Sequence, residues 1–306
     1  MDGDLLAQLT LTGVVTGSFY AVMAIGFALI IGTTGRFHFA YGVVYALAGY
    51  VIYTGCEVLG LPFFASAAIA CVIAAMLGMA IEAFLYRPLE RRAGGQALLG
   101  IFITALGLAL VAENLIKFAW GPSDFVLLSV TQVAYAIGPV TFVNFDIGQV
   151  VTALVVVIGM TILLRKTDLG RLILAVKSNP QLAQSGGLSP RRVFLIVFAL
   201  GSVLSVLAGM WQFSKYTVSA GMGFSPTLTA FVIAFLAGLQ LKPLVLAAWS
   251  LTIALAEQFV TIWFDSAWSH LVVLVGLLVY LCVLSWRTSG LSLRRRRRPA
   301  PSGSLA

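Results

Sequence analysis

Long apolar runs follow one another along this chain of 306 residues, separated by short groups of charged residues, glycine, proline, asparagine or aspartate. A helix needs about 20 apolar residues to cross the hydrocarbon core of a bilayer. The runs that approach or reach this length are 8–33, 38–55, 61–85, 97–118, 147–164, 193–213, 226–241, 243–263 and 269–286. The pattern therefore predicts an all-α, polytopic integral membrane protein.

Two of these runs, 38–55 and 226–241, are short for a full crossing. Backbone that is not helical is tolerated at membrane depth only where protein covers it or where it lines a cavity. We therefore expect eight or nine transmembrane helices, in which either short run is a broken or re-entrant helix inside the bundle.

The composition agrees with this prediction, because 60% of the residues are hydrophobic, 10% are charged and the mean hydropathy is +1.01. No stretch remains for a sizeable soluble domain. Asp2 and Asp4 occupy the place where a secretory signal carries positive charge, so the first run is predicted to be a span. We expect residues 1–290 to form one transmembrane domain and residues 291–306 to form a basic, disordered cytoplasmic tail.

The basic residues are distributed unevenly over the predicted loops. All but Lys117 and Lys215 of the 19 lysines and arginines fall on one side of a nine-span arrangement, whereas loop 119–146 carries two aspartates and no base. Since basic loops face the cytoplasm, the N-terminus is predicted outside and the C-terminus inside. The arginine run 294–298 is expected to touch anionic lipid rather than nucleic acid.

One polar segment, residues 165–192, interrupts the apolar pattern, and most of it reads "GRLILAVKSNPQLAQSGGLSPRRV" (170–193). Asn179 followed by Pro180 favours a helix start, because the asparagine side chain accepts a backbone N–H and proline lacks one. Gly186 and Gly187 favour the end of that helix. We predict a short capped helix on the cytoplasmic face. An ordinary connector is the simpler interpretation, although connectors are usually shorter.

This segment resembles the cytoplasmic coupling loop of permease subunits in bacterial ABC importers for branched-chain amino acids. The likeness continues in "GSFYAVMAIGFALIIGTTGRFHFAYGVVYALAGY" (17–50), "YRPLERR" (86–92) and "ITALGLALVAENLIKFAWGP" (103–122). It departs from the family at "AGLQLKPLVLA" (237–247), where a glycine-rich turn is common. The positions that the resemblance assigns to the coupling loop are Gly170, Arg171, Ala175, Asn179, Pro180, Ala183, Gly187, Arg191 and Arg192.

The resemblance implies a translocation subunit of the bacterial inner membrane that is not itself an enzyme. Its implied partners are a second similar permease, two ATPase subunits and an extracytoplasmic solute-binding protein, which would face loop 119–146 and segment 214–225. Because the chain has no G-x-x-x-x-G-K-[ST] motif, we expect no cofactor on it and ATP on the partner subunits. The cargo would be branched-chain or other amino acids. Import of urea or short amides, or a stand-alone secondary transporter or channel, are the alternatives.

Ionisable groups at membrane depth are costly and therefore mark candidate functional positions. The candidates for a translocation path are His38, Tyr41, Tyr45 and Glu257. For Glu257 the alternative is a hydrogen bond between helices, and for the region of His38 the alternative is a tight turn permitted by glycines. Glu82 and Glu113, near the ends of their runs, are expected at the membrane interface.

Neither a metal site nor a catalytic set is predicted. Cys56, Cys71 and Cys282 are scattered through or beside apolar runs, and no cysteine and histidine spacing suggests metal ligands. We expect all three cysteines to be packing residues. The glycines and alanines of 13–49 are expected to permit close helix packing.

Overall fold

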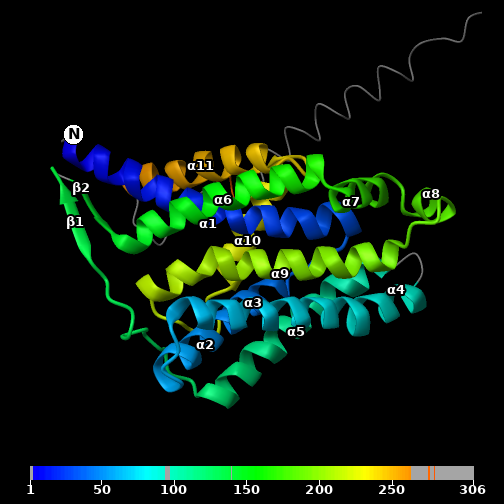
Figure 1. Ribbon diagram of the computed structural model, residues 1–306, viewed down its shortest axis with the longest axis horizontal. Helices are drawn as coiled ribbons and strands as arrows, with labels where there is room; N and C mark the ends of the chain where they lie inside the picture. The colour runs from blue at the N-terminus through cyan, green and yellow to red at the C-terminus, as the bar shows by residue number, and fades with distance from the viewer. Residues whose placement is uncertain (1–2, 94–96, 139, 263–274, 276–278, 280–306) are drawn as a thin grey trace, which may run out of the picture.

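The computed structural model describes the whole chain except residues 1–2, 94–96, 139, 263–274, 276–278 and 280–306. It is a bundle of helices with one short β-hairpin (Figure 1). The ninth predicted run, 269–286, lies almost wholly outside the described residues, and so do Cys282 and the tail 291–306.

Within the described residues, six helical stretches are long and apolar enough to cross a membrane. They are α1 (Gly3–Thr34), α3 (Phe63–Ala80) with its continuation η2 (Ile81–Tyr86) and α4 (Arg87–Ala93), α5 (Ala97–Trp120), α6 (Asn144–Lys166), α9 (Pro190–Lys215) and α11 (Pro243–Val260). Each corresponds to one predicted run. The prediction of a polytopic, predominantly helical membrane protein is therefore confirmed.

The two runs predicted to be short are short helices. Both α2 (Tyr41–Tyr53), which continues into the π-helical turn η1 (Thr54–Val58), and α10 (Phe224–Leu236) have 13 residues. At about 1.5 Å per residue, such a helix is about 20 Å long, less than the roughly 30 Å of a bilayer core. The remaining helices, α7 (Asp168–Ser178) and α8 (Pro180–Ser185), form the polar segment.

The central helix of the bundle is α1, which is buried along most of its length from Gly13 onward. A Cβ atom at Gly13 would lie 2.7 Å from a methyl carbon of Leu255 on α11. Gly26 of α1 and Gly201 of α9 face each other in the same way, since a Cβ on either would lie 3.1 Å from the carbonyl oxygen of the other. Small residues thus bring these backbones together, and the prediction of close packing is confirmed.

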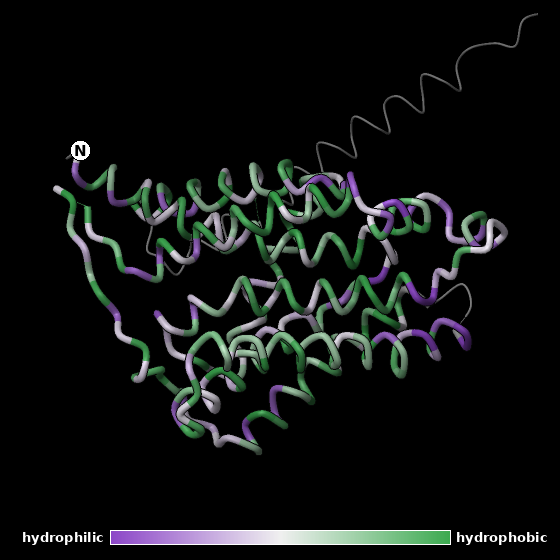
Figure 2. The backbone as a smooth tube through the Cα atoms, in the orientation of Figure 1, coloured by the Kyte–Doolittle hydropathy of each residue, from purple (hydrophilic) through white to green (hydrophobic). Residues whose placement is uncertain are grey.

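Hydrophilic residues gather toward the two ends of the bundle, most densely over α4 (Figure 2). One end carries α4, α7 and α8, and we call it the α7–α8 end (Figure 1). The opposite end carries an antiparallel hairpin of β1 (Ala134–Ile137) and β2 (Val140–Val143), and we call it the hairpin end. This hairpin lies within 119–146, which the sequence pattern predicted only as a loop.

Candidate functional site

The polar segment forms two capped helices, which we call the α7–α8 segment (residues 167–189). The Thr167 hydroxyl accepts a hydrogen bond from the backbone N–H of Gly170 at 3.1 Å, a cap that sequence analysis missed. As predicted, the Asn179 side chain caps α8 by accepting from the Leu182 N–H at 3.0 Å, and Pro180 takes the first helical position. Ser189 followed by Pro190 repeats this sequence signal before α9, but the Ser189 side chain forms no capping bond.

Two backbone hydrogen bonds close the end of α8. The Leu188 N–H donates to the Ala183 carbonyl at 3.0 Å, and the Gly187 N–H donates to the Gln184 carbonyl at 3.0 Å. This is the Schellman arrangement, which needs a residue in the left-handed region after the helix. Gly187 has φ +81°, a conformation that glycine adopts without strain. The predicted glycine stop is therefore confirmed.

One side of the α7–α8 segment is fastened to the bundle. A Cβ atom at Gly170 would lie 2.6 Å from the Cα of Leu164, so the start of α7 lies directly against the end of α6. Ile173, Val176 and Ala183 are buried as well. The other side is free, because Leu182 is 70% exposed and its polar neighbours on α8 are exposed too.

A lysine connects the α7–α8 segment to the turn between α10 and α11. Nζ of Lys177 donates to the Leu239 carbonyl at 2.8 Å, and burial lowers the pKa of this lysine. Gly238 and Leu239 have φ +68° and +54°, so the turn contains two successive left-handed residues, of which the second is not glycine. This turn lies in the region where the sequence departs from the family pattern.

The α7–α8 end is strongly basic. A hollow of about 390 Å³ at the junction of α4 and α9 is lined by Ala83, Arg87, Pro88, Arg91, Arg92 and Arg191. Arg192 is exposed beside it, whereas the exposed Arg171 pairs with Asp168 on its own helix at 3.1 Å. Of the three arginines that the resemblance assigns to the coupling loop, Arg191 and Arg192 are therefore near this hollow, and the charge of Arg171 is partly neutralised.

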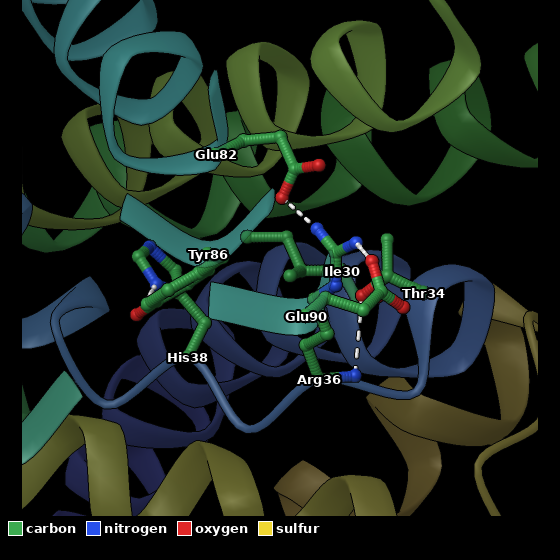
Figure 3. A network of polar contacts seen from close by, with 7 residues as sticks. All are labelled: Ile30, Thr34, Arg36, His38, Glu82, Tyr86 and Glu90. Atoms are coloured by element: carbon green, nitrogen blue, oxygen red, sulfur yellow. Dashed lines mark hydrogen bonds and ion pairs between the residues drawn. The ribbon is translucent and has the colours of Figure 1, made fainter. Parts of the chain in front are cut away.

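The break between α1 and α2 is held by buried polar contacts (Figure 3). The Arg36 guanidinium forms ion pairs with Glu82 and Glu90. Its central carbon, Cζ, lies 5.0 Å from the centre of the Phe194 ring. Arg36 and Glu82 are both 2% exposed. Glu82 therefore faces the inside of the protein, and its expected level at the membrane interface stays a prediction.

The four candidate path residues are buried in the bundle. Nδ1 of His38 and the Tyr86 hydroxyl are 2.8 Å apart, and the Tyr41 hydroxyl donates to the Met23 carbonyl at 3.3 Å. Tyr45 is 4% exposed. The Tyr20 hydroxyl donates to a carboxylate oxygen of Glu257 at 2.9 Å, which is the hydrogen bond between helices that sequence analysis gave as the alternative.

Beside these residues, the starts of α2 and α10 meet. A Cβ atom at Gly42 would lie 2.6 Å from the Gly223 carbonyl oxygen. Between this contact and α5 lies a cavity of about 440 Å³. Its lining comprises Phe39, Gly42, Val43, Leu106, Ala109, Leu110, Glu113, Ala220, Gly221, Gly223 and Phe224. This cavity could not be predicted from the sequence, because its three walls are far apart along the chain.

Comparisons with known proteins agree with this architecture. Residues 9–282 match the family described as "Branched-chain amino acid transport system / permease component". The permease protein BraD of the high-affinity branched-chain amino acid transport system of Pseudomonas aeruginosa is 25% identical, with 93% of this chain and 94% of that protein covered. Its counterpart LivH of Escherichia coli is also 25% identical, with 90% and 93% covered.

A solved structure, PsaBC from Streptococcus pneumoniae in complex with Fab, is similar in fold, with a TM-score of 0.50, 14% identity and 90% of each chain covered. This likeness concerns the arrangement of helices alone. The family match, in contrast, extends over most of the sequence and includes both ends of the bundle. The chain therefore belongs to the permease component family of branched-chain amino acid transport systems.

Proposed function

We propose that this chain is the membrane-spanning permease subunit of an ATP-driven importer that carries branched-chain or other amino acids across the bacterial cytoplasmic membrane. Its partners in this proposal are a second similar permease, two ATPase subunits and an extracytoplasmic solute-binding protein. The family match and the names of BraD and LivH support the cargo class. The observation that carries the mechanism is the α7–α8 segment, fastened on one side and exposed on the other.

The α7–α8 segment is suited to transmit a push from an ATPase subunit. A segment that transmits force must move as one body. The side-chain caps and the Schellman end hold α7 and α8 in one conformation. A displacement of the α7–α8 segment would reach α6 through the backbone contact at Gly170. It would reach the turn before α11 through the hydrogen bond of Lys177. ATP binding and hydrolysis in the partner would thereby shift the helices next to the α1–α2 break and the α9–α10 connection. The cargo would then have access from one side of the membrane and afterwards from the other.

The hairpin end is proposed to receive the solute-binding protein. Loop 119–146 and segment 214–225, assigned to this role by resemblance, are joined by paired hydrogen bonds between Phe125 and Val218 at 2.7 and 3.0 Å. The hairpin is fastened to α1, because the Gln8 amide and the Thr141 backbone exchange two hydrogen bonds. A docked protein would therefore contact α1, α5 and α9 through one continuous surface.

A reconstitution experiment tests this proposal. The permease, a second permease, the ATPase subunits and the binding protein are placed in proteoliposomes, and uptake of labelled leucine is followed with and without ATP. We expect uptake only with ATP and with the ATPase subunits. Uptake that persists without any ATPase would favour a stand-alone transporter or channel. ATP-dependent uptake of urea or short amides, with none of leucine, would favour the alternative cargo.

A further inference from the structure

We infer that the cavity between α2, α5 and α10 is a recognition subsite for a zwitterionic amino acid with an aliphatic side chain, and that Glu113 binds its ammonium group. This inference rests on the proposed function and gives the cargo a place in the bundle. The cavity's volume of about 440 Å³ is within the range of roughly 300–1,000 Å³ of small-molecule sites.

The walls of the cavity are suited to an aliphatic side chain. Leu106, Ala109 and Leu110 of α5 form one wall, and Phe39 and Val43 from the start of α2 form another. Phe224, which is 56% exposed, stands at the first position of α10. Burial of apolar area against such walls favours a hydrocarbon side chain.

Glu113 is the one ionisable residue in this lining. Its carboxylate oxygen would lie 3.4 Å from a Cβ atom placed on Gly221, so the charge is directed to the wall formed by the α9–α10 connection. Lys117, one turn along α5, contacts the same carboxylate at 2.7 Å, and the Glu113 side chain is 31% exposed. A carboxylate has lone pairs for more than one donor, so Glu113 retains capacity for an ammonium group.

Two helices begin at the wall opposite α5. Both α2 and α10 start at the contact between Gly42 and Gly223. No side chain caps either start, and first-turn N–H groups such as those of Gly42 and Phe224 donate to backbone carbonyls. A helix start carries about half a positive charge, which favours a nearby carboxylate. An apolar cavity with a carboxylate at one side and two helix starts at another is therefore complementary to an amino acid that carries both charges. A purely cationic or purely anionic solute would match only one side.

Binding of labelled L-leucine to the purified permease and ATPase complex, without the binding protein, tests the role of Glu113. Glu113→Gln keeps the size of the side chain and removes its charge. We expect the dissociation constant to rise about tenfold or more, because a hydrogen bond between two charged groups is lost. Asp124→Asn is the control, since it also removes one carboxylate charge but lies at an exposed position outside the cavity lining. An unchanged dissociation constant in Glu113→Gln, or an equal rise in Asp124→Asn, would overturn the assignment.

The size of the cavity is tested by uptake in proteoliposomes. Ala109→Phe would fill part of the cavity, and we expect leucine uptake to fall at least about fivefold more than alanine uptake. Ala119→Phe adds the same bulk at an exposed position of α5 and should leave the ratio unchanged. Equal losses of leucine and alanine uptake in Ala109→Phe would overturn the inference.

Failure of the inference can be distinguished from failure of the proposed function. If the wild-type complex imports leucine with ATP while the Glu113 and Ala109 variants behave like it, only the cavity assignment fails. If the wild-type complex hydrolyses ATP and imports urea but neither amino acid, the inference fails and ATP-driven import stands. If uptake never depends on ATP, the proposed function itself fails.

Discussion

The two ends of the bundle are built in different ways. At the α7–α8 end, Arg36 is buried together with Glu82, Gly170 lies directly against α6, and the helix caps are neutral side chains. At the hairpin end, partly exposed polar side chains fasten the loops, as Glu57 does by accepting three hydrogen bonds from Leu128 and Ser129. The first end is suited to transmit force, whereas the second can adjust to a docked protein.

Loss of the Arg36 charge should have the largest effect. Arg36→Met leaves Glu82 buried without its cation, and removal of one partner of a buried ion pair costs about 3–5 kcal/mol of unfolding free energy. Denaturant titration of the purified protein in mild detergent measures this loss. Arg192→Gln, at an exposed arginine of the same end, is the control and should change the value by no more than about 0.5 kcal/mol.

The double variant Arg36→Met/Glu82→Met sharpens this test. It removes both buried charges, so it should be more stable than Arg36→Met alone. If Arg36→Met were as stable as Arg192→Gln, the buried ion pairs would not hold the break between α1 and α2.

The contact at Gly170 should have an intermediate effect. Gly170→Ala places a methyl group against the backbone of α6, where Leu164 Cα would lie 2.6 Å away, and such overpacking costs about 1–3 kcal/mol. We expect faster amide exchange in α7. Gly107→Ala in α5 is the matched control, because nothing lies within 4 Å of a Cβ there, and it should stabilise its helix. Equal exchange in the two variants would contradict the close approach of α7 to α6.

The dependence of amide exchange on pH should be the smallest effect, and it should differ between the two ends of the bundle. Hydrogen bonds from Ser129 and Leu128 lower the pKa of Glu57. Because the pKa of Glu57 is lowered in the folded protein, the stabilisation of the loop by these hydrogen bonds is complete at neutral pH. It is lost as the pH falls through the lowered pKa, below the ordinary range of a glutamate. At pH values below the ordinary range of a glutamate, the amides around 128–129 should therefore lose protection against exchange, relative to their intrinsic exchange rate at the same pH.

The caps of α7 and α8 provide the internal control for this pH change. Thr167 and Asn179 do not ionise, so their helices should keep their protection over the same pH range. Glu57→Gln should accelerate exchange at 128–129 already at neutral pH and weaken its dependence on pH. Equal acid sensitivity at both ends would remove the distinction between them.

The apolar pattern predicted the helices well, because length and hydropathy alone decide which runs span a bilayer. It also predicted that 38–55 and 226–241 are short, and that Asn179 and Gly187 bound α8. The hairpin was missed because its strands have four residues each and β1 is wholly exposed, so no alternation of burial marks it.

Contacts between distant residues could not be predicted from the sequence. Arg36 and Glu82 are 46 positions apart, and each alone is a charged residue near the end of an apolar run. The cavity beside Glu113 needs the meeting of Gly42 and Gly223, which only the folded bundle provides. The roles predicted for His38, Tyr41, Tyr45 and Glu257 in a path stay predictions.

Photo-crosslinking in native membranes tests most directly whether the α7–α8 segment contacts the ATPase. A photoreactive residue replaces Leu182 on α8, which is 70% exposed, and in a second variant it replaces Tyr135 on β1, which is 47% exposed. We predict that position 182 crosslinks to the ATPase subunit and that position 135 does not. Crosslinking of the ATPase at position 135, with none at position 182, would contradict the account.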